Sequence, residues 1–123
     1  MKILTVDDSA TMRRIIAGAA SVMGIETLGA GNGLEALKIL EKEGDSISLI
    51  LLDVNMPGMD GIEALKRIKA DPRWSKIPVM MVTSESERAH VIEAIQSGAS
   101  SYLAKPFAPE DLIKKIMQNV GPM

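Results

Sequence analysis

Acidic residues stand directly after two apolar stretches of the chain. Asp53 follows Leu49–Leu52, and Asp7 and Asp8 follow the segment 2–6. An apolar run that stops at a carboxylate is typical of a buried strand that ends at the edge of a sheet. Three carboxylates brought to one edge would repel one another, unless one is protonated, a salt bridge compensates, or a divalent cation binds. Since the chain has no Cys and a single His, oxygen ligands favour a hard ion, Mg²⁺ or Mn²⁺.

Two further polar residues end apolar stretches nearer the C-terminus. Thr83 follows Val79–Val82, and Lys105 follows Ser101–Ala104. A lysine ammonium and a threonine hydroxyl are groups suited to phosphate oxygens. The whole set therefore suits phosphoryl chemistry, with carboxylates for a metal, one carboxylate as nucleophile, and the lysine and threonine on the transferred group.

The elements that must position these residues are five strands alternating with five helices. Continuous apolar strands, covered on both faces, predict an α/β fold with a parallel sheet. The strands are expected over residues 2–6, 25–30, 48–53, 79–83 and 101–104.

The helices are predicted from capping residues and from apolar positions at helical spacing. The expected caps and stops are Asp8 or Ser9, Gly24, Asn32 with Glu35, Asp60 with Glu63, Asp71-Pro72, Ser84 or Ser86, Gly98, Pro109 and Gly121. The expected apolar faces comprise Met12, Ile15, Ile16, Ala19, Ala20 and Met23; Leu34, Leu37 and Leu40; Ile62, Leu65 and Ile68; Val91, Ile92 and Ile95; and Leu112, Ile113, Ile116 and Met117.

The order of the strands decides which of their ends meet. Right-handed crossovers place helices on both faces of the sheet only if the strand order reverses once. We adopt the order 2-1-3-4-5 from known doubly wound folds rather than from the residues themselves. In that order the first and third strands are neighbours, so Asp7, Asp8 and Asp53 converge, with Thr83 and Lys105 beside them.

Composition excludes several classes of protein. The 123 residues fit one domain, and a net charge of −2 leaves no basic footprint for nucleic acid. One Trp, one Tyr and one Phe argue against aromatic platforms for bases or flavins. No signal peptide is visible, and no apolar run approaches the ~20 residues needed to cross a bilayer, so a cytoplasmic location without membrane insertion is expected.

Taken together, the motifs resemble those of response-regulator receiver domains over essentially the full length. Each motif alone is weak, but their order and their placement at strand ends are specific. The matching pieces are Val6-Asp7-Asp8, Asp53, Met56-Pro57-Gly58-Met59-Asp60-Gly61, Thr83-Ser84 and Gly98–Phe107. The resemblance implies the flavodoxin-like and CheY-like version of the doubly wound fold.

For the acidic cluster, the resemblance implies a phosphorylation site. Asp53 would accept a phosphoryl group from a histidine kinase. Asp7 and Asp8 would bind Mg²⁺ together with Asp53 and the backbone carbonyl of Asn55. Self-phosphorylation and self-dephosphorylation would be the only reactions of the chain itself, so a true enzyme is not expected.

The resemblance also implies a switch. Thr83 and Lys105 would contact the phosphoryl oxygens, and the peptide bond between Lys105 and Pro106 would be cis. When Thr83 moves toward the phosphoryl group, Tyr102 would turn from an outward to an inward rotamer. The surface of the fourth helix, fifth strand and fifth helix would change with it. A half-buried strand tyrosine without a switching role is the alternative for Tyr102.

Among receivers, the chain looks most like the freestanding chemotaxis type. Residues 1–123 are expected to form one receiver domain without an output domain, and the protein is expected to be a monomer. Asn55 and Glu85 stand at the positions that tune self-dephosphorylation in the family. The output partner would then be a protein such as a flagellar motor switch protein, with a phosphatase as a further partner.

Other functions remain as alternatives. A freestanding receiver can also serve a phosphorelay outside chemotaxis. A phosphohydrolase of the haloacid dehalogenase type needs a second Asp two residues after its nucleophile, where this chain has Asn55. A flavodoxin-like electron carrier needs a Ser/Thr/Gly-rich phosphate loop after the first strand, where this chain has the acidic Asp7-Asp8-Ser9.

Overall fold

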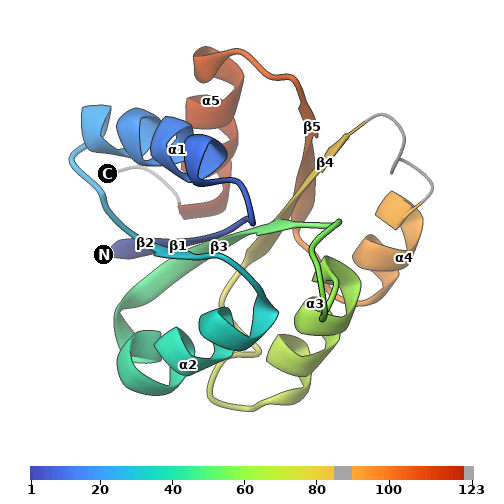
Figure 1. Cartoon of the computed structure of the whole chain (residues 1–123). Coiled ribbons are helices and arrows are strands. Elements are labelled where there is room, and N and C mark those ends of the chain that lie inside the picture. Colours follow the sequence, from blue (N-terminus) through green and yellow to red (C-terminus); the bar gives the residue numbers. More distant parts are fainter. Residues whose placement is uncertain (85–89, 121–123) are drawn as a thin grey trace.

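Five parallel strands form one sheet in the order β2-β1-β3-β4-β5, as expected (Figure 1). The computed structural model describes residues 1–84 and 90–120. The strands are β1 (Lys2–Val6), β2 (Glu26–Ala30), β3 (Ile47–Asp53), β4 (Val79–Ser84) and β5 (Ser101–Lys105). The reversal of strand order between β1 and β3 creates the crevice at the carboxyl edge in which ligands of such sheets bind.

Helices cover both faces of the sheet. In Figure 1, α1 and α5 lie on one face, whereas α2, α3 and α4 lie on the other. The helices are α1 (Ala10–Val22), α2 (Gly33–Glu43), α3 (Gly61–Ala70), α4 (His90–Gln96) and α5 (Pro109–Val120), with a short 3₁₀ turn, η1 (Gly44–Ser46), after α2. None of these described helices has the length and apolar content that crossing a bilayer requires.

The central strand β3 contributes to two separate hydrophobic cores. Ile50 and Leu52 lie in the core beneath α2, α3 and α4, and Leu49 and Leu51 lie in the core beneath α1 and α5. All four side chains are almost completely buried. Alternation of side chains along a strand thus explains why this segment is apolar without interruption.

Polar side chains begin three of the helices at the predicted positions. Ser9, Asn32 and Asp60 each accept a hydrogen bond from a backbone N–H in the first turn, at 2.8–3.1 Å. The second half of each predicted capping box is absent, however. The Glu35 carboxylate accepts from the backbone N–H of Gly31, and Glu63 pairs with Arg67. These caps therefore rest on the first residue of the box.

The ends of the helices also agree with the predicted signals. Gly24 and Gly98 follow α1 and α4 with φ values of 74° and 110°, which favour glycine. Helix α3 ends at Ala70, just before Asp71-Pro72. Ser84 is the last residue of β4, and the candidate caps Ser86 and Gly121 lie outside the described residues.

The width of the apolar helix faces was predicted wrongly. Some of the buried helix positions are small residues, and Ala36 and Ala94 are buried almost completely. Because these helices pack closely through a narrow stripe, flanking large side chains reach solvent. The predicted face residues that are exposed are Ile15, Leu34, Ile92, Ile95 and Met117.

Candidate functional site

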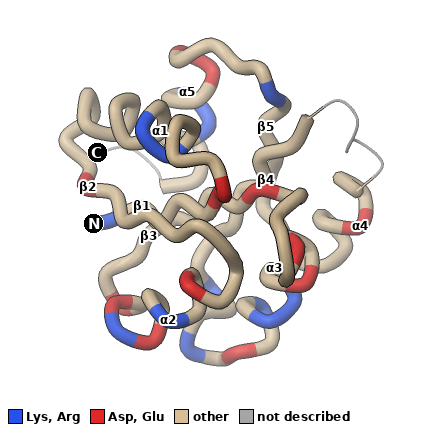
Figure 2. Tube along the Cα trace, viewed as in Figure 1, with Lys and Arg blue, Asp and Glu red and all other residues tan. Residues whose placement is uncertain are grey.

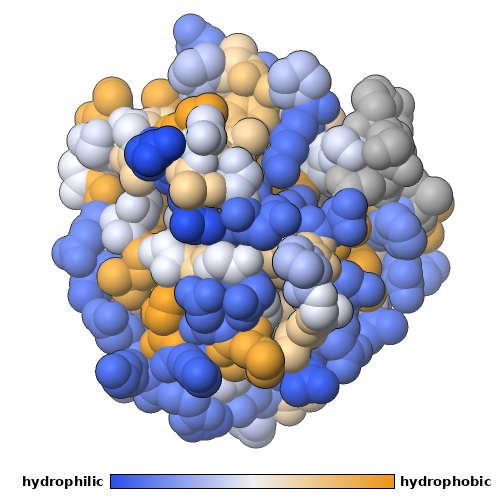
Figure 3. Space-filling model, in the orientation of Figure 1, coloured by the Kyte–Doolittle hydropathy of each residue, from blue (hydrophilic) through white to orange (hydrophobic). Residues whose placement is uncertain are grey.

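Three carboxylates meet at the carboxyl edge of the sheet. Val6 pairs with Leu52 in the β1–β3 ladder, so the residues that follow them, Asp7 and Asp53, are neighbours. With Asp8, these residues can place carboxylate oxygens within 4.8 Å of one another. Asp7 and Asp53 are 2% and 4% exposed, whereas Asp8 lies at the surface. Figure 2 shows these acidic tube segments at the ends of β1 and β3, and Figure 3 shows that the central part of this face is largely hydrophilic.

Asp7 is held by groups on three sides. Its backbone N–H donates to the carbonyl of Ala30 at 3.0 Å, which continues the β1–β2 ladder. One carboxylate oxygen accepts from the backbone N–H of Ser9 at 2.9 Å, and the other accepts from Lys105 at 3.2 Å. The buried carboxylate is therefore fixed before any ligand arrives.

Lys105 brings a positive charge into the acidic cluster. Its Nζ lies 3.2 Å from Asp7 Oδ2 and 3.5 Å from Asp53 Oδ1. Burial lowers the pKa of Lys105, but the charges of Asp53 and Asp7 and their hydrogen bonds outweigh it, so that the pKa lies above its usual value. The peptide bond to Pro106 is cis, as expected. Lys105 is thus an ammonium ion at neutral pH.

Thr83 lies on the strand next to Asp53. Val82 pairs with Asp53 in the β3–β4 ladder, and Thr83 follows it. The Thr83 side chain is fully buried and its hydroxyl donates to the carbonyl of Ser84 at 3.2 Å. A neutral hydroxyl therefore stands beside the charged cluster.

The connection from β3 to α3 depends on a close backbone approach that our sequence reasoning missed. The N–H of Gly61 donates to the carbonyl of Val54 at 2.8 Å. A Cβ atom at Gly61 would come within 2.0 Å of the Asp53 carbonyl oxygen. Only glycine fits there. The available signal was its position directly after the cap Asp60.

Asn55 lies at the rim of the site. It is exposed and lines a cavity of about 250 Å³ with Val54, Asp60, Ile62 and His90. Because Val54 and Asn55 directly follow Asp53, this cavity lies next to the end of β3. Glu85, the other residue predicted to tune dephosphorylation, lies outside the described residues.

The donor set fits a hard divalent cation. The three carboxylates of the cluster carry two more formal negative charges than the Lys105 ammonium balances, in a site where two of the carboxylates are buried. Oxygen ligands with surplus negative charge are those that Mg²⁺ and Mn²⁺ prefer. Asp7, Asp8 and Asp53 are therefore suitable ligands.

Tyr102 points outward. Its side chain on β5 is 37% exposed, and the ammonium of Lys115 on α5 lies 6.0 Å from the ring centroid. In the β4–β5 ladder, Tyr102 pairs with Met81, two residues before Thr83. Residues two apart on a strand share a face of the sheet, so Tyr102 and Thr83 lie on the same face.

Comparisons with known proteins agree with this fold. Residues 3–117 match the family described as response regulator receiver domain. The chemotaxis protein CheY1 of Helicobacter pylori is 43% identical over 122 residues, which cover 98% of each chain. CheY-3 of Vibrio cholerae is 45% identical over 117 residues, covering 94% of this chain and 88% of its own.

Solved structures with the same fold lead to the same family. The chemotaxis protein CheY4 of Vibrio cholerae has a TM-score of 0.88 at 34% identity and covers 96% of this chain and 97% of its own. A response regulator from Chloroflexus aurantiacus has a TM-score of 0.90 at 30% identity, with 98% of both chains covered. The chain belongs to the response regulator receiver family, and it is a signalling protein of two-component systems rather than a conventional enzyme.

Proposed function

We propose that this protein is a receiver that a histidine kinase phosphorylates on Asp53. The observation that carries the proposal is the cluster of Asp7, Asp8 and Asp53, with Lys105 paired to Asp7 and Asp53. The cluster combines a nucleophilic carboxylate, ligands for a cation and a fixed positive charge. These are the parts that phosphoryl transfer to a carboxylate requires.

Each residue has a distinct task in the proposed transfer. An Asp53 carboxylate oxygen forms a bond to phosphorus while the phosphorus–nitrogen bond of the donor's phosphohistidine breaks, and the electron pair stays on the imidazole nitrogen. The Lys105 ammonium, which pairs with the Asp53 carboxylate before the transfer, then pairs with the phosphoryl oxygens. The Thr83 hydroxyl donates a hydrogen bond to the same oxygens. Asp7, Asp8, Asp53 and the carbonyl of Asn55 would hold Mg²⁺, which neutralises the phosphoryl charge when bound.

The new charge on Asp53 would be read through Thr83 and Tyr102. Phosphorylation adds charge and acceptor oxygens, which draws the Thr83 hydroxyl from the Ser84 carbonyl. Tyr102, on the same face of the sheet, can then turn inward. The outward Tyr102 side chain, which is 37% exposed, would then be the starting state of this switch.

The partner surface is expected to act in chemotaxis. Relatives at 43% and 45% identity are chemotaxis proteins. The protein would therefore bind a target such as a flagellar motor switch protein through α4, β5 and α5. Asn55 and Glu85 would set the lifetime of the phosphorylated form, alone or with a phosphatase. A phosphorelay outside chemotaxis is the alternative.

Phosphorylation with a small donor tests the proposal. Wild-type protein with Mg²⁺ and a low-molecular-weight acyl phosphate or phosphoramidate should gain one phosphoryl group, detected by mass and by its sensitivity to hydroxylamine. Asp53→Asn should gain none. Asp60→Asn is the matched control, because Asp60 is an exposed helix cap outside the cluster and Asn caps helices as well. Full labelling of Asp53→Asn would overturn the assignment.

A binding experiment separates the two pathways. The protein with beryllofluoride, which mimics the phosphorylated carboxylate, should bind a purified flagellar motor switch protein more tightly than the untreated protein. Tyr102→Ala should reduce that difference. Equal binding with and without beryllofluoride would favour a phosphorelay outside chemotaxis.

A further inference from the structure

The side chain of Arg13 reaches from α1 back to the main chain of the acidic cluster. Its guanidinium donates a short hydrogen bond to the backbone carbonyl of Asp7. The backbone N–H of the same residue donates to the carbonyl of Ser9 at 3.1 Å. The second bond belongs to the first turn of α1, so the guanidinium contact with the Asp7 carbonyl is the one that depends on the Arg13 side chain.

Two glycines make room for this side chain. A Cβ atom at Gly29 would lie 3.2 Å from Cδ and 3.5 Å from Nε of Arg13, and one at Gly31 would lie 3.6 Å from Nη1. Gly29 and Gly31 flank Ala30, which accepts the hydrogen bond from the Asp7 N–H. The Arg13 side chain thus lies across the end of β2. In Figure 2 the basic segment of α1 lies above β1 and β2.

The hydrogen bond from Arg13 to the Asp7 carbonyl matters because no described group restrains the Asp8 side chain. Among residues 1–84 and 90–120, no group donates to the Asp8 carboxylate, and Arg13 is the only side chain bonded to the main chain of Asp7 or Asp8. The orientation of the Asp7–Asp8 peptide therefore sets the place from which the Asp8 side chain leaves the main chain. The Asp7 carbonyl belongs to that peptide, and Arg13 holds it.

We propose that Arg13 is a positioning residue for the divalent cation, which acts by fixing the Asp7–Asp8 peptide. This inference rests on the magnesium site proposed above and adds a residue that does not touch the cation. Partners of this kind hold metal ligands in place and change metal affinity when they are removed.

Charge and position predict opposite effects when Arg13 is removed. A guanidinium near the site repels a cation, so the loss of its charge alone would tighten Mg²⁺ binding. Loss of the hydrogen bond to the Asp7 carbonyl would instead leave Asp8 less well placed and weaken Mg²⁺ binding. The sign of the change in dissociation constant distinguishes the two effects.

Calorimetric titration of MgCl₂ into Arg13→Met and Arg14→Met is the first test. Arg14 is the matched control because it is adjacent and exposed, and its one side-chain hydrogen bond among the described residues goes to Thr11 at 3.5 Å. We expect the Mg²⁺ dissociation constant to rise roughly tenfold in Arg13→Met. It should stay the same or fall slightly in Arg14→Met, and Arg13→Lys should restore part of the affinity. Mg²⁺ binding in Arg13→Met that equals or exceeds that of the wild type would overturn the proposal.

Gly29→Ala tests the same contact from β2 and leaves every charge in place. A methyl group there displaces the Arg13 side chain, so Mg²⁺ binding should weaken, and the NMR amide signals of Asp8 and Ser9 should shift before Mg²⁺ is added. Gly18→Ala is the control, because a Cβ atom at Gly18 meets nothing within 4 Å. Unchanged Mg²⁺ affinity in Gly29→Ala would count against the proposal even if Arg13→Met failed to fold. If the wild type bound no Mg²⁺, the proposed site itself would fail first.

Discussion

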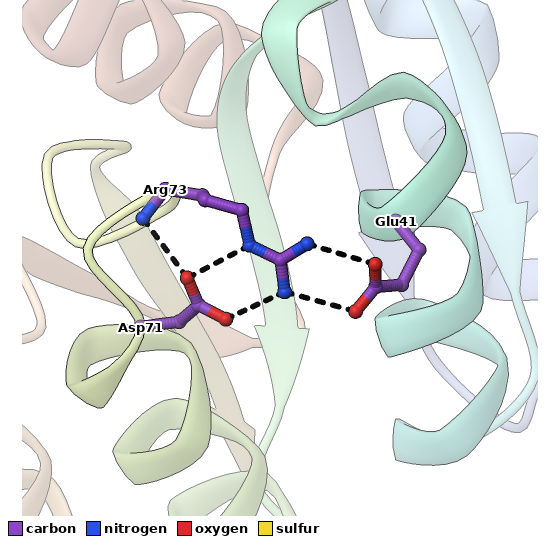
Figure 4. A network of polar contacts seen from close by, with 3 residues as sticks. All are labelled: Glu41, Asp71 and Arg73. Atoms are coloured by element: carbon purple, nitrogen blue, oxygen red, sulfur yellow. Dashed lines mark hydrogen bonds and ion pairs between the residues drawn. The ribbon is translucent and has the colours of Figure 1, made fainter.

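The two ends of the sheet both carry clustered charges, but the charges are balanced differently. At the amino end, Arg73 pairs with Glu41 and with Asp71 at 2.8–2.9 Å and lies 4.5 Å from the ring centroid of Trp74 (Figure 4). This network ties the end of α2 to the loop before β4. At the carboxyl end, the Lys105 ammonium pairs with Asp7 and Asp53, and Asp8 adds a third carboxylate to the cluster.

Two half-buried lysines, one at each end of the sheet, show the same difference in how charge is balanced. Lys69, near the amino end, donates to the carbonyls of Ser75 and Ile77 at 3.0 and 2.6 Å, and its burial lowers its pKa. Lys105 is also partly buried, yet its pKa is raised because carboxylates surround it. The charged groups described at the amino end are therefore paired with other groups of the protein, whereas the carboxyl end keeps surplus negative charge that a bound cation can balance.

The largest expected effect is the gain in stability on adding Mg²⁺, which should depend on the carboxyl end of the sheet and not on the amino end. At a free Mg²⁺ concentration one hundred times the dissociation constant, the wild type should gain about 2.7 kcal/mol in free energy of unfolding, since only the native state binds. Asp53→Asn should lose most of this gain, whereas Arg73→Met should keep it. Urea unfolding followed by circular dichroism measures each increment. An equal gain in Asp53→Asn would place the cation outside the cluster.

A smaller effect is expected from Asp8→Asn without Mg²⁺. This change removes one of three mutually repelling charges and breaks no hydrogen bond among the described residues, so the free energy of unfolding should rise by about 1 kcal/mol. Glu41→Gln at the amino end should instead lower it, because Glu41 is paired with Arg73. Chemical unfolding in EDTA measures both. A loss of stability in Asp8→Asn would show that the cluster is balanced without a cation.

Most of the fold could be predicted because β1, β3 and β4 are apolar runs with distinct ends. The strand order came from known folds, and the neighbours it implied for Asp7 and Asp53 were confirmed. The helix caps at Ser9, Asn32 and Asp60 could be read from residue type alone, since their hydrogen bonds are local.

The missed features depend on contacts between segments far apart in the sequence. Ile92 is apolar at helical spacing, yet it is exposed, whereas Ala94 on the same helix is buried. Gly61 is needed only because α3 begins against the backbone of Asp53. The reach of Arg13 across Gly29 likewise cannot be seen before β2 and α1 are placed side by side.

Opposite pH dependences are expected for the two lysines. A raised pKa means that the stabilisation from Lys105 is complete below the unfolded value of about 10.5 and is lost as the pH rises through the folded value. A lowered pKa means that stability at Lys69 rises as the pH increases toward about 10.5. The difference in unfolding free energy between the wild type and Lys105→Met should therefore shrink at high pH, and that for Lys69→Met should grow. If both differences in unfolding free energy changed in the same direction as the pH rises, the two lysines would not differ in the way proposed.

The smallest expected effect is that of Arg73→Lys. The ammonium keeps the charge but cannot form paired hydrogen bonds with both Glu41 and Asp71, so a slight loss of stability should follow, as is usual for exposed ion pairs. The fluorescence of Trp74, the only Trp of the chain, should change in the native state because Arg73 lies over its ring. The Mg²⁺ dissociation constant should stay that of the wild type, since the network lies at the opposite end of the sheet. A changed Mg²⁺ affinity in Arg73→Lys would mean that the two ends of the sheet are energetically coupled and cannot be treated as independent.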